Sequence, residues 1–217
     1  MQERSNMKVA GGLQEDGIVI GNTYDKYGSR NPVVRYLMKG YEESLNEMVD
    51  FVKPESIHEV GCGEGYWSLK WLEKGIATRG SDFSKIVIDM ARSNARERGL
   101  PDENFVAKDI YDLDPGDDKA NLVVCCQVLE HLERPDDALM VLQRIASPYL
   151  IICVPCEPKW SFLNMARGKY WADMGNTPGH IQRWSKKEFV KLAARYFDVV
   201  KVNSPLPWTM LLCKTRQ

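Results

Sequence analysis

Between residues 57 and 196, short apolar runs alternate with longer stretches of helical periodicity. The runs at 122–125 and 149–154 are apolar at nearly every position, which is typical of strands buried on both faces of a sheet. Alternation of such strands with amphipathic helices predicts a mostly parallel sheet with helices on both faces. The expected strands are 57–60, 76–80, 104–107, 121–125 and 149–154, and the expected helices are 65–74, 84–98, 135–146 and 185–196.

Two further strands are expected near the end of the chain, at 199–204 and 208–213. The segment Ser204-Pro205-Leu206-Pro207 that joins them is too short for the crossover helix that parallel strands need, so they must pair antiparallel. The fold class that follows is α/β: a Rossmann-like, doubly wound, mostly parallel seven-stranded sheet with an antiparallel last strand. A length of 217 residues suits one such domain with a small insertion.

Three segments accompany this domain, which we expect to span residues 23–217. Residues 1–22 are Gly-rich and polar without a sustained period, and we expect a mobile N-terminal arm. Residues 23–53 are expected to hold N-terminal lid helices, the long one beginning where Asn31 precedes Pro32. Residues 156–180 form an insertion after the fifth strand, which we interpret as a lid over a ligand pocket. Packing on the sheet edge, a dimer face and a peripheral membrane contact are the alternatives.

Charge and hydropathy narrow the class of protein. No stretch approaches the roughly 18 consecutive apolar residues of a membrane span. The first six residues lack an apolar signal core, so we expect a cytoplasmic protein. The net charge is −1, which gives no general reason to bind nucleic acid. Residues 156–217 nevertheless carry +7 and residues 1–155 carry −8, so either the surface charges compensate each other or the late segment faces an anionic ligand.

The six cysteines are expected to be reduced thiols in such a compartment. Cys153 and Cys156 form a Cys-x-x-Cys pair, and Cys125 and Cys126 end what should be the neighbouring strand. A structural zinc site needs a closed tetrahedron of ligands, which strand interiors rarely supply. We therefore interpret these cysteines as buried free thiols and expect no metal site.

A glycine-rich loop follows the first expected strand, with glycines at 61, 63 and 65. Glycine allows a tight turn and a close approach of the backbone to a ligand, and in open α/β sheets ligands bind beside this loop. The dinucleotide fingerprint would need glycine at position 66, which is Tyr66, and a P-loop would need Lys and then Ser or Thr after Gly65. The spacing therefore favours a smaller, cationic or zwitterionic nucleoside.

Two acidic residues follow the next two expected strands. Asp82 lies 21 residues after Gly61, at the distance where a carboxylate accepts hydrogen bonds from ribose hydroxyls. Asp109 follows the third strand, beside a slot of adenine size. Because each of these features ends a successive strand, we expect the glycine loop and both acids to meet at one edge of the sheet.

With these segments the chain resembles the class I S-adenosylmethionine-dependent methyltransferases, and among them the small-molecule type called type 11. The resemblance is carried by residues 59–65, 80–82, 108–110, 128–132 and the closing strand pair. It implies S-adenosylmethionine as the cofactor, whose methionine part would lie against Glu59, Gly61, Cys62, Gly63 and Gly65, whose ribose would bind Asp82, and whose adenine would contact Phe83, Asp109 and Ile110. It also implies a carbonyl contact from Gln127 and lid tyrosines at Tyr24 and Tyr27.

Methyl transfer from a sulfonium is an in-line displacement, and most of its catalysis can come from proximity and alignment. His131 follows the fourth strand and is the candidate proton acceptor or substrate hydrogen-bond partner, with bracing of the loop as the alternative. His180 is either a substrate contact or part of the lid packing. The candidate substrate and lid residues are Tyr27, Trp160, Arg167, Tyr170, His180 and Trp184.

The predicted function is transfer of a methyl group from S-adenosylmethionine to an oxygen or nitrogen atom of a small-molecule acceptor of anionic or amphipathic character. A nucleic-acid or protein methyltransferase is the first alternative. Against it, no Asn/Asp-Pro-Pro-Tyr/Phe signature follows the fourth strand, and the chain is not basic overall. A non-catalytic cofactor-binding subunit is the second alternative, against which the intact glycine loop argues. The expected partners are a small-molecule acceptor and no nucleic acid, in a monomer or homodimer.

Overall fold

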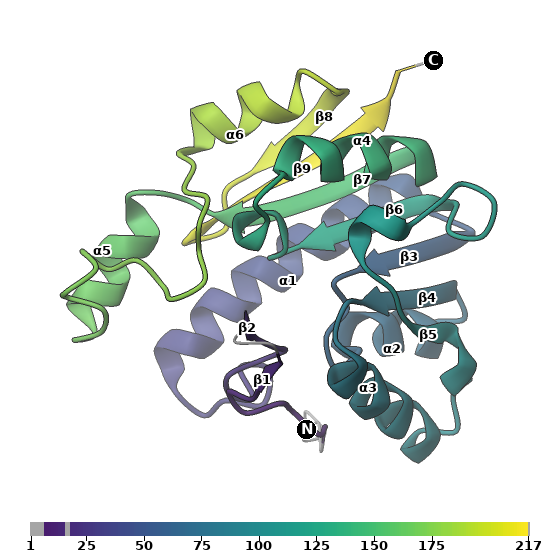
Figure 1. Cartoon of the computed structure of the whole chain (residues 1–217), viewed down its shortest axis with the longest axis horizontal. Coiled ribbons are helices and arrows are strands. Elements are labelled where there is room, and N and C mark those ends of the chain that lie inside the picture. Colours follow the sequence, from purple (N-terminus) through teal and green to yellow (C-terminus); the bar gives the residue numbers. More distant parts are fainter. Residues whose placement is uncertain (1–6, 16–17, 217) are drawn as a thin grey trace.

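A seven-stranded sheet forms the centre of the computed structural model, which describes residues 7–15 and 18–216. The strands lie in the order β5-β4-β3-β6-β7-β9-β8 (Figure 1). Their bounds are β3 Ser56–Val60, β4 Ala77–Asp82, β5 Phe105–Ala107, β6 Ala120–Cys126, β7 Ala146–Pro155, β8 Phe197–Asn203 and β9 Trp208–Thr215.

The pairing of these strands confirms the predicted fold class. β3 pairs parallel with both β4 and β6, and β6 pairs parallel with β7. β9 lies between β7 and β8 and is antiparallel to both. The order changes direction at β3, since β4 and β5 extend the sheet to one side of it and β6 and β7 to the other. Ligands of open α/β sheets bind at the carboxyl ends of the strands beside such a switch point.

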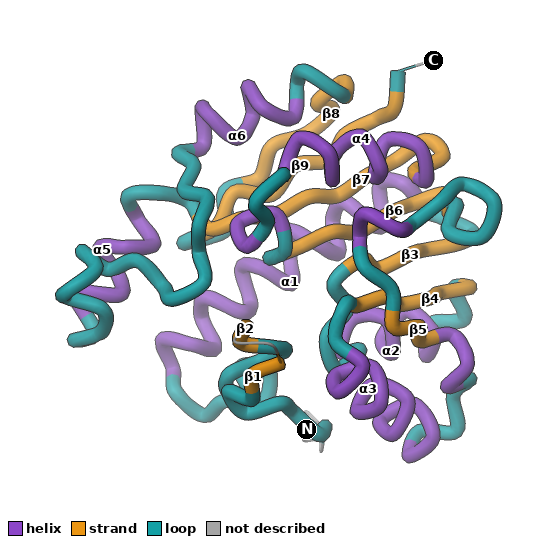
Figure 2. The backbone as a smooth tube through the Cα atoms, in the orientation of Figure 1, coloured by secondary structure: helices purple, strands orange, loops and turns teal. Residues whose placement is uncertain are grey.

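Helices cover both faces of the sheet, as predicted (Figure 2). α1 Pro32–Val52 and α2 Tyr66–Glu73 pack on one face, where Trp71 and Leu45 are fully buried against residues of β6, β7 and β9. α4 Pro135–Ile145 and α6 Lys186–Ala193 pack on the other face around Leu142 and Phe189. α3 Lys85–Glu97 packs beside β4 and β5. Because helices cover both faces, β6 and β7 carry apolar side chains at most positions.

Capping residues fix the helix boundaries close to the predicted positions. The Asn31 side chain accepts a hydrogen bond from the Val33 amide at 2.9 Å, and Pro32 is the first helical residue of α1. Ser185 and Glu188 form a capping box that begins α6. The predicted insertion after β7 contains α5 Lys159–Ala166, and the three short 3₁₀ turns are η1 Asp102–Asn104, η2 Ile110–Asp112 and η3 Leu129–His131.

The N-terminal segment differs from the predicted mobile arm. Residues 7–15 and 18–22 pack against the domain, with Ala10 and Ile20 buried, and they include the two-residue strands β1 Gln14–Glu15 and β2 Ile18–Val19. Glu64 of the glycine loop binds this segment through the amides of Ala10 and Asn22. Residues 1–6 lie outside the described part of the chain. Residues 23–53 hold one helix, α1, rather than several.

All six cysteines are free thiols, and five of them are buried. This agrees with the interpretation of the Cys153 and Cys156 pair as packing residues. Within the described ranges, the helices are all too short or too polar to cross a membrane.

Candidate functional site

A cavity of about 340 Å³ lies at the carboxyl ends of β3, β4, β5 and β6. The structure therefore brings together the glycine loop and the two acids that follow β4 and β5, as the sequence predicts. The predicted site residues that line the cavity are Tyr27, Glu59, Gly61, Cys62, Gly63, Asp82, Phe83, Asp109, Ile110, Gln127 and His131.

Two positions of the glycine loop that line the cavity have backbone conformations that favour glycine. Gly61 has a φ of +75°, and a Cβ there would lie 2.2 Å from Val128 Cγ2. Gly63 has a φ of +53° and lines the cavity. Gly65 does not line it: a Cβ at this position would meet the Phe105 ring at 2.9 Å and Ala91 at 3.2 Å, so this glycine allows the loop to pack closely against β5 and α3. Its role as a cofactor contact stays a prediction.

Asp82 holds the loop that follows β4 against the glycine loop. Its carboxylate accepts hydrogen bonds from the Gly63 amide at 3.0 Å and from the Ser84 amide at 3.1 Å. Burial raises the pKa of this carboxyl above its usual value, while the two amides lower it. The carboxylate lines the cavity one residue before Phe83, so both predicted contacts of the adenosine part lie on one wall.

Glu59 lies at the deep end of the cavity, on β3. Its Oε2 accepts hydrogen bonds from the Ser68 amide at 2.9 Å and the Ser68 hydroxyl at 2.5 Å, which fix the side chain from the α2 side. Burial raises the pKa of Glu59 to about 8. A cationic ligand group nearby would favour the ionised form, because an opposite charge offsets the cost of desolvation.

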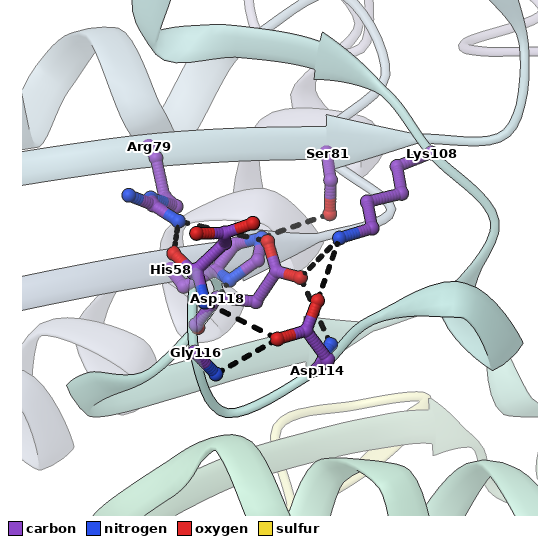
Figure 3. A network of polar contacts seen from close by, with 8 residues as sticks. His58, Arg79, Ser81, Lys108, Asp114, Gly116 and Asp118 are labelled. Carbon is purple, nitrogen blue, oxygen red and sulfur yellow. Dashed lines mark hydrogen bonds and ion pairs between the residues drawn. The ribbon is translucent and has the colours of Figure 1, made fainter.

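The loop after β5 is held by a polar network beneath the cavity (Figure 3). The His58 ring donates from Nδ1 to the Asp118 carbonyl at 2.8 Å and accepts at Nε2 from the Ser81 hydroxyl at 2.9 Å. Lys108 binds the Asp118 carboxylate at 2.6 Å. Burial lowers the pKa of His58 to about 4, so the ring is neutral at neutral pH. This network positions Asp109, which follows Lys108 directly and caps η2 through the Tyr111 amide.

Gln127 turns sharply away from the end of β6, with a φ of +61°. Its side-chain carbonyl accepts a hydrogen bond from the Trp208 indole at 2.9 Å, and its own amide N–H donates to the Cys153 carbonyl at 2.8 Å. Gln127 lines the cavity, as predicted, and the hydrogen bond from Trp208 of β9 holds its side chain.

Several residues of the cavity wall carry no local sequence signal. Asn22 donates to Glu64 from both its amides, which folds the N-terminal segment over the glycine loop. Lys26 lies half-buried in the wall, and burial lowers its pKa although Glu64 and Glu130 raise it. Glu64 differs from these residues, because it belongs to the glycine loop. A charged side chain between two glycines could have indicated from the sequence that this residue has a role in the site.

Most of the predicted substrate and lid residues lie outside the lining of this cavity, and the lid role of the insertion stays a prediction. Trp160, Arg167, Tyr170, His180 and Trp184 are all absent from the lining. Arg167 donates to the Asn164 side chain, and Trp184 packs against Phe189 of α6. Tyr24 is 46% exposed and also lies outside the lining, so of the two predicted lid tyrosines Tyr27 alone reaches the cavity.

The insertion instead contacts His131, which lines the cavity. His131 Nδ1 lies 2.9 Å from the Gly179 carbonyl, and the His131 and His180 rings pack edge to face with centroids 4.9 Å apart. Trp160 stacks on the other side of His180. Burial lowers the pKa of both histidines, that of His180 to about 4. Both shifts favour the neutral imidazole, and His131 brings such a ring to the cavity wall.

The sheet order, the glycine loop and the acids after β4 and β5 have the arrangement expected of a class I methyltransferase fold. Residues 57–148, less than half of the chain, match the family model described as a methyltransferase domain. This match agrees with the predicted resemblance to the S-adenosylmethionine-dependent class I methyltransferases.

Relatives and solved structures agree with this assignment. A ubiquinone biosynthesis O-methyltransferase of Methylococcus capsulatus is 25% identical over 152 residues, covering 62% of each chain. One of Coxiella burnetii is 30% identical over 84 residues, covering 39% of this chain and 36% of the relative. The chain thus spans about a third of the length of that relative. Magnesium protoporphyrin IX methyltransferase from Synechocystis, solved with bound S-adenosylhomocysteine, superposes with a TM-score of 0.66 at 19% identity, covering 89% of this chain and 94% of the other.

Proposed function

We propose that the protein transfers a methyl group from S-adenosylmethionine to an oxygen atom of a small-molecule acceptor. The observation that carries the proposal is the single cavity shared by Gly63, Asp82 and Asp109, at the carboxyl ends of three neighbouring strands. The names of the relatives, which are O-methyltransferases, favour oxygen over nitrogen as the accepting atom.

The residues of the cavity fit this cofactor. Gly61 and Gly63 bring bare backbone with positive φ to the cavity wall, and Glu59 offers a carboxylate to a positively charged amino group. Asp82 offers a carboxylate to the ribose hydroxyls. When bound, S-adenosylmethionine supplies a methyl group on a positively charged sulfur, and as the acceptor oxygen bonds to the methyl carbon the carbon–sulfur bond breaks and its electron pair stays on sulfur.

The chain's own part in the reaction is alignment and proton handling. Holding the acceptor oxygen in line behind the methyl group accounts for most of the rate that such a site supplies. The His131 ring lines the cavity, and its Nδ1 is engaged by the Gly179 carbonyl. Its Nε2 is then free to accept a hydrogen bond from an acceptor hydroxyl and to orient it.

Binding of S-adenosylhomocysteine measured by calorimetry tests the cofactor part of the proposal. Asp82→Ala should weaken binding about 100-fold, because a buried charged hydrogen bond is worth roughly 1.5–3 kcal/mol and the Gly63 amide also loses its partner. Asp112→Ala is the matched control, since Asp112 is exposed and outside the cavity. Equal affinities of wild type and Asp82→Ala would contradict the assignment.

Methyl transfer to separated pools of metabolites, RNA and protein, followed with labelled S-adenosylmethionine, tests the acceptor class. We expect label in an oxygen-containing metabolite and none of it with Asp82→Ala. Label confined to RNA or protein would replace the small-molecule acceptor with a macromolecule.

A further inference from the structure

Three side chains of metal-ligand type meet beside the cavity, where the insertion contacts His131. Glu130, His131 and His180 each offer a ligand atom, and these three atoms lie within 4.8 Å of one another. Glu130 is 1% exposed, yet neither of its carboxylate oxygens has a hydrogen-bond partner among the described residues. A buried carboxylate without any partner is costly, and such a group in a folded protein calls for a missing partner such as an ion.

The chain holds His180 over Glu130 by backbone contacts. The amides of Ile181 and Gln182 both donate to the Glu130 carbonyl at 3.0 Å. The Gln182 side chain also donates to the Leu132 carbonyl at 3.0 Å. These bonds join the segment after His180 to η3. Hydrogen bonds to the backbone therefore hold the two histidines and the carboxylate close to one another.

The His131 ring is oriented as metal-bound histidines usually are. Its Nδ1 lies 2.9 Å from the Gly179 carbonyl, and a carbonyl can only accept, so Nδ1 carries the hydrogen. The Nε2 lone pair is then left for another partner. A backbone carbonyl on one ring nitrogen, with the other nitrogen on the ion, is the common arrangement around histidine ligands.

We propose that Glu130, His131 and His180 bind one divalent transition-metal ion beside the part of the cavity wall that His131 forms, which we call the acceptor end. Two imidazoles and one carboxylate suit ions such as Mn²⁺, Co²⁺ or Zn²⁺. Metal–ligand bonds of about 2.0–2.2 Å put ligand atoms roughly 3–4 Å apart, so small side-chain rotations close the present spacing. The ion would also balance the charge of Glu130.

Three protein ligands leave coordination positions open for water or substrate. Because His131 lines the cavity, an open position would take the oxygen of the acceptor, and this role rests on the proposed function. Coordination would then replace the hydrogen bond to His131 Nε2, and the acceptor class narrows to compounds that offer an oxygen ligand to a divalent ion.

Lys26 is the rival partner of Glu130, since its ammonium lies close enough to interact with this carboxylate. If Lys26 alone balances Glu130, an ion is not needed. Lys26→Met separates the two possibilities: it should leave metal affinity unchanged or raise it, because it removes a competing positive charge.

Titration of the tag-free, chelator-treated full chain with Co²⁺, Mn²⁺ and Zn²⁺ tests the site by calorimetry and, for Co²⁺, by visible absorption. We expect one ion per chain for at least one of these metals. Glu130→Gln and His180→Ala should each lower the affinity at least about tenfold. Glu133→Gln, which removes an exposed carboxylate from the same loop, should not change it.

The proposal fails if none of the three ions binds stoichiometrically, or if both Glu130→Gln and His180→Ala keep wild-type affinity. It also fails if Glu133→Gln lowers the affinity equally. Binding of S-adenosylhomocysteine, measured in parallel, shows whether each variant is folded and keeps the two proposals apart. Full methyl transfer by the chelator-treated enzyme would contradict the metal proposal and support the proposed methyltransferase function. Metal binding without binding of S-adenosylhomocysteine would support the metal site and contradict the methyltransferase function.

Discussion

The two ends of the cavity satisfy their polar groups in opposite ways. At the cofactor end, Asp82, Glu59 and Glu64 each accept hydrogen bonds from the protein's own amides or hydroxyls. At the acceptor end, behind the cavity wall, both oxygens of Glu130 lack a partner among the described residues, although this side chain is as buried as that of Glu64. The cofactor end is therefore complete as the chain alone builds it, whereas the acceptor end is built to take a charged or polar partner.

The same substitution at each end should have different effects on stability, and this is the largest difference we expect. Glu64→Gln should lower the free energy of unfolding by about 2–3 kcal/mol, because its NH2 group would face the donating side-chain amide of Asn22 and the negative charge that strengthens the bonds from the Ala10 and Asn22 backbone amides would be lost. Glu130→Gln should not lower it, since no hydrogen bond is lost and a buried ionisable group is removed. Urea unfolding in the presence of a chelator measures both.

A loss of equal size in the two variants would contradict the comparison, because it would mean that Glu130 has a protein partner. The chelator matters, since a bound ion would stabilise the wild type through Glu130 and imitate such a partner.

The residues of the cofactor end were easier to predict from the sequence than those of the acceptor end. Gly63, Asp82 and Asp109 all lie within a few residues of a strand end, and the parallel register of β3, β4 and β5 brings strand ends together. Local pattern and general topology were therefore enough to place them in one cavity.

The acceptor end depends on contacts between distant segments that no local pattern announces. His131 and Gly179 are 48 positions apart, and they meet because the amides of Ile181 and Gln182 bond to the Glu130 carbonyl. The same reason explains the error in the N-terminal segment, where a few buried side chains and the carboxylate of Glu64 hold residues that look like a free arm.

Acid should test whether the cofactor end is stabilised by its buried network. Burial lowers the pKa of His58 to about 4 from its ordinary 6.5. Between these values the unfolded chain binds one more proton than the native protein, so this histidine lowers the free energy of unfolding as the pH falls. From pH 7.5 to pH 5 its contribution should be a loss of about 2 kcal/mol.

His58→Gln should remove that loss. The difference between the free energies of unfolding of wild type and His58→Gln should therefore change with pH. Glu59 and Glu130, whose pKa values burial raises to about 8, act in the opposite direction but equally in both proteins. Parallel pH curves for wild type and His58→Gln would show that His58 is not the neutral ring that joins Asp118 to Ser81.

We expect the smallest effect from Trp160→Phe. This variant tests whether a change near the acceptor end alters cofactor binding at the other end. The Trp160 indole donates to the Thr177 hydroxyl at 2.9 Å, and its ring stacks on His180. Phenylalanine keeps a stacking ring, and Thr177 keeps its bond from the Asn164 side chain, so we expect a loss below about 1 kcal/mol. Because Trp160 lies outside the cavity lining, affinity for S-adenosylhomocysteine should stay within about twofold by calorimetry. A tenfold loss would mean that the insertion shapes the cofactor end through His180 and His131, and the division between the two ends would no longer hold.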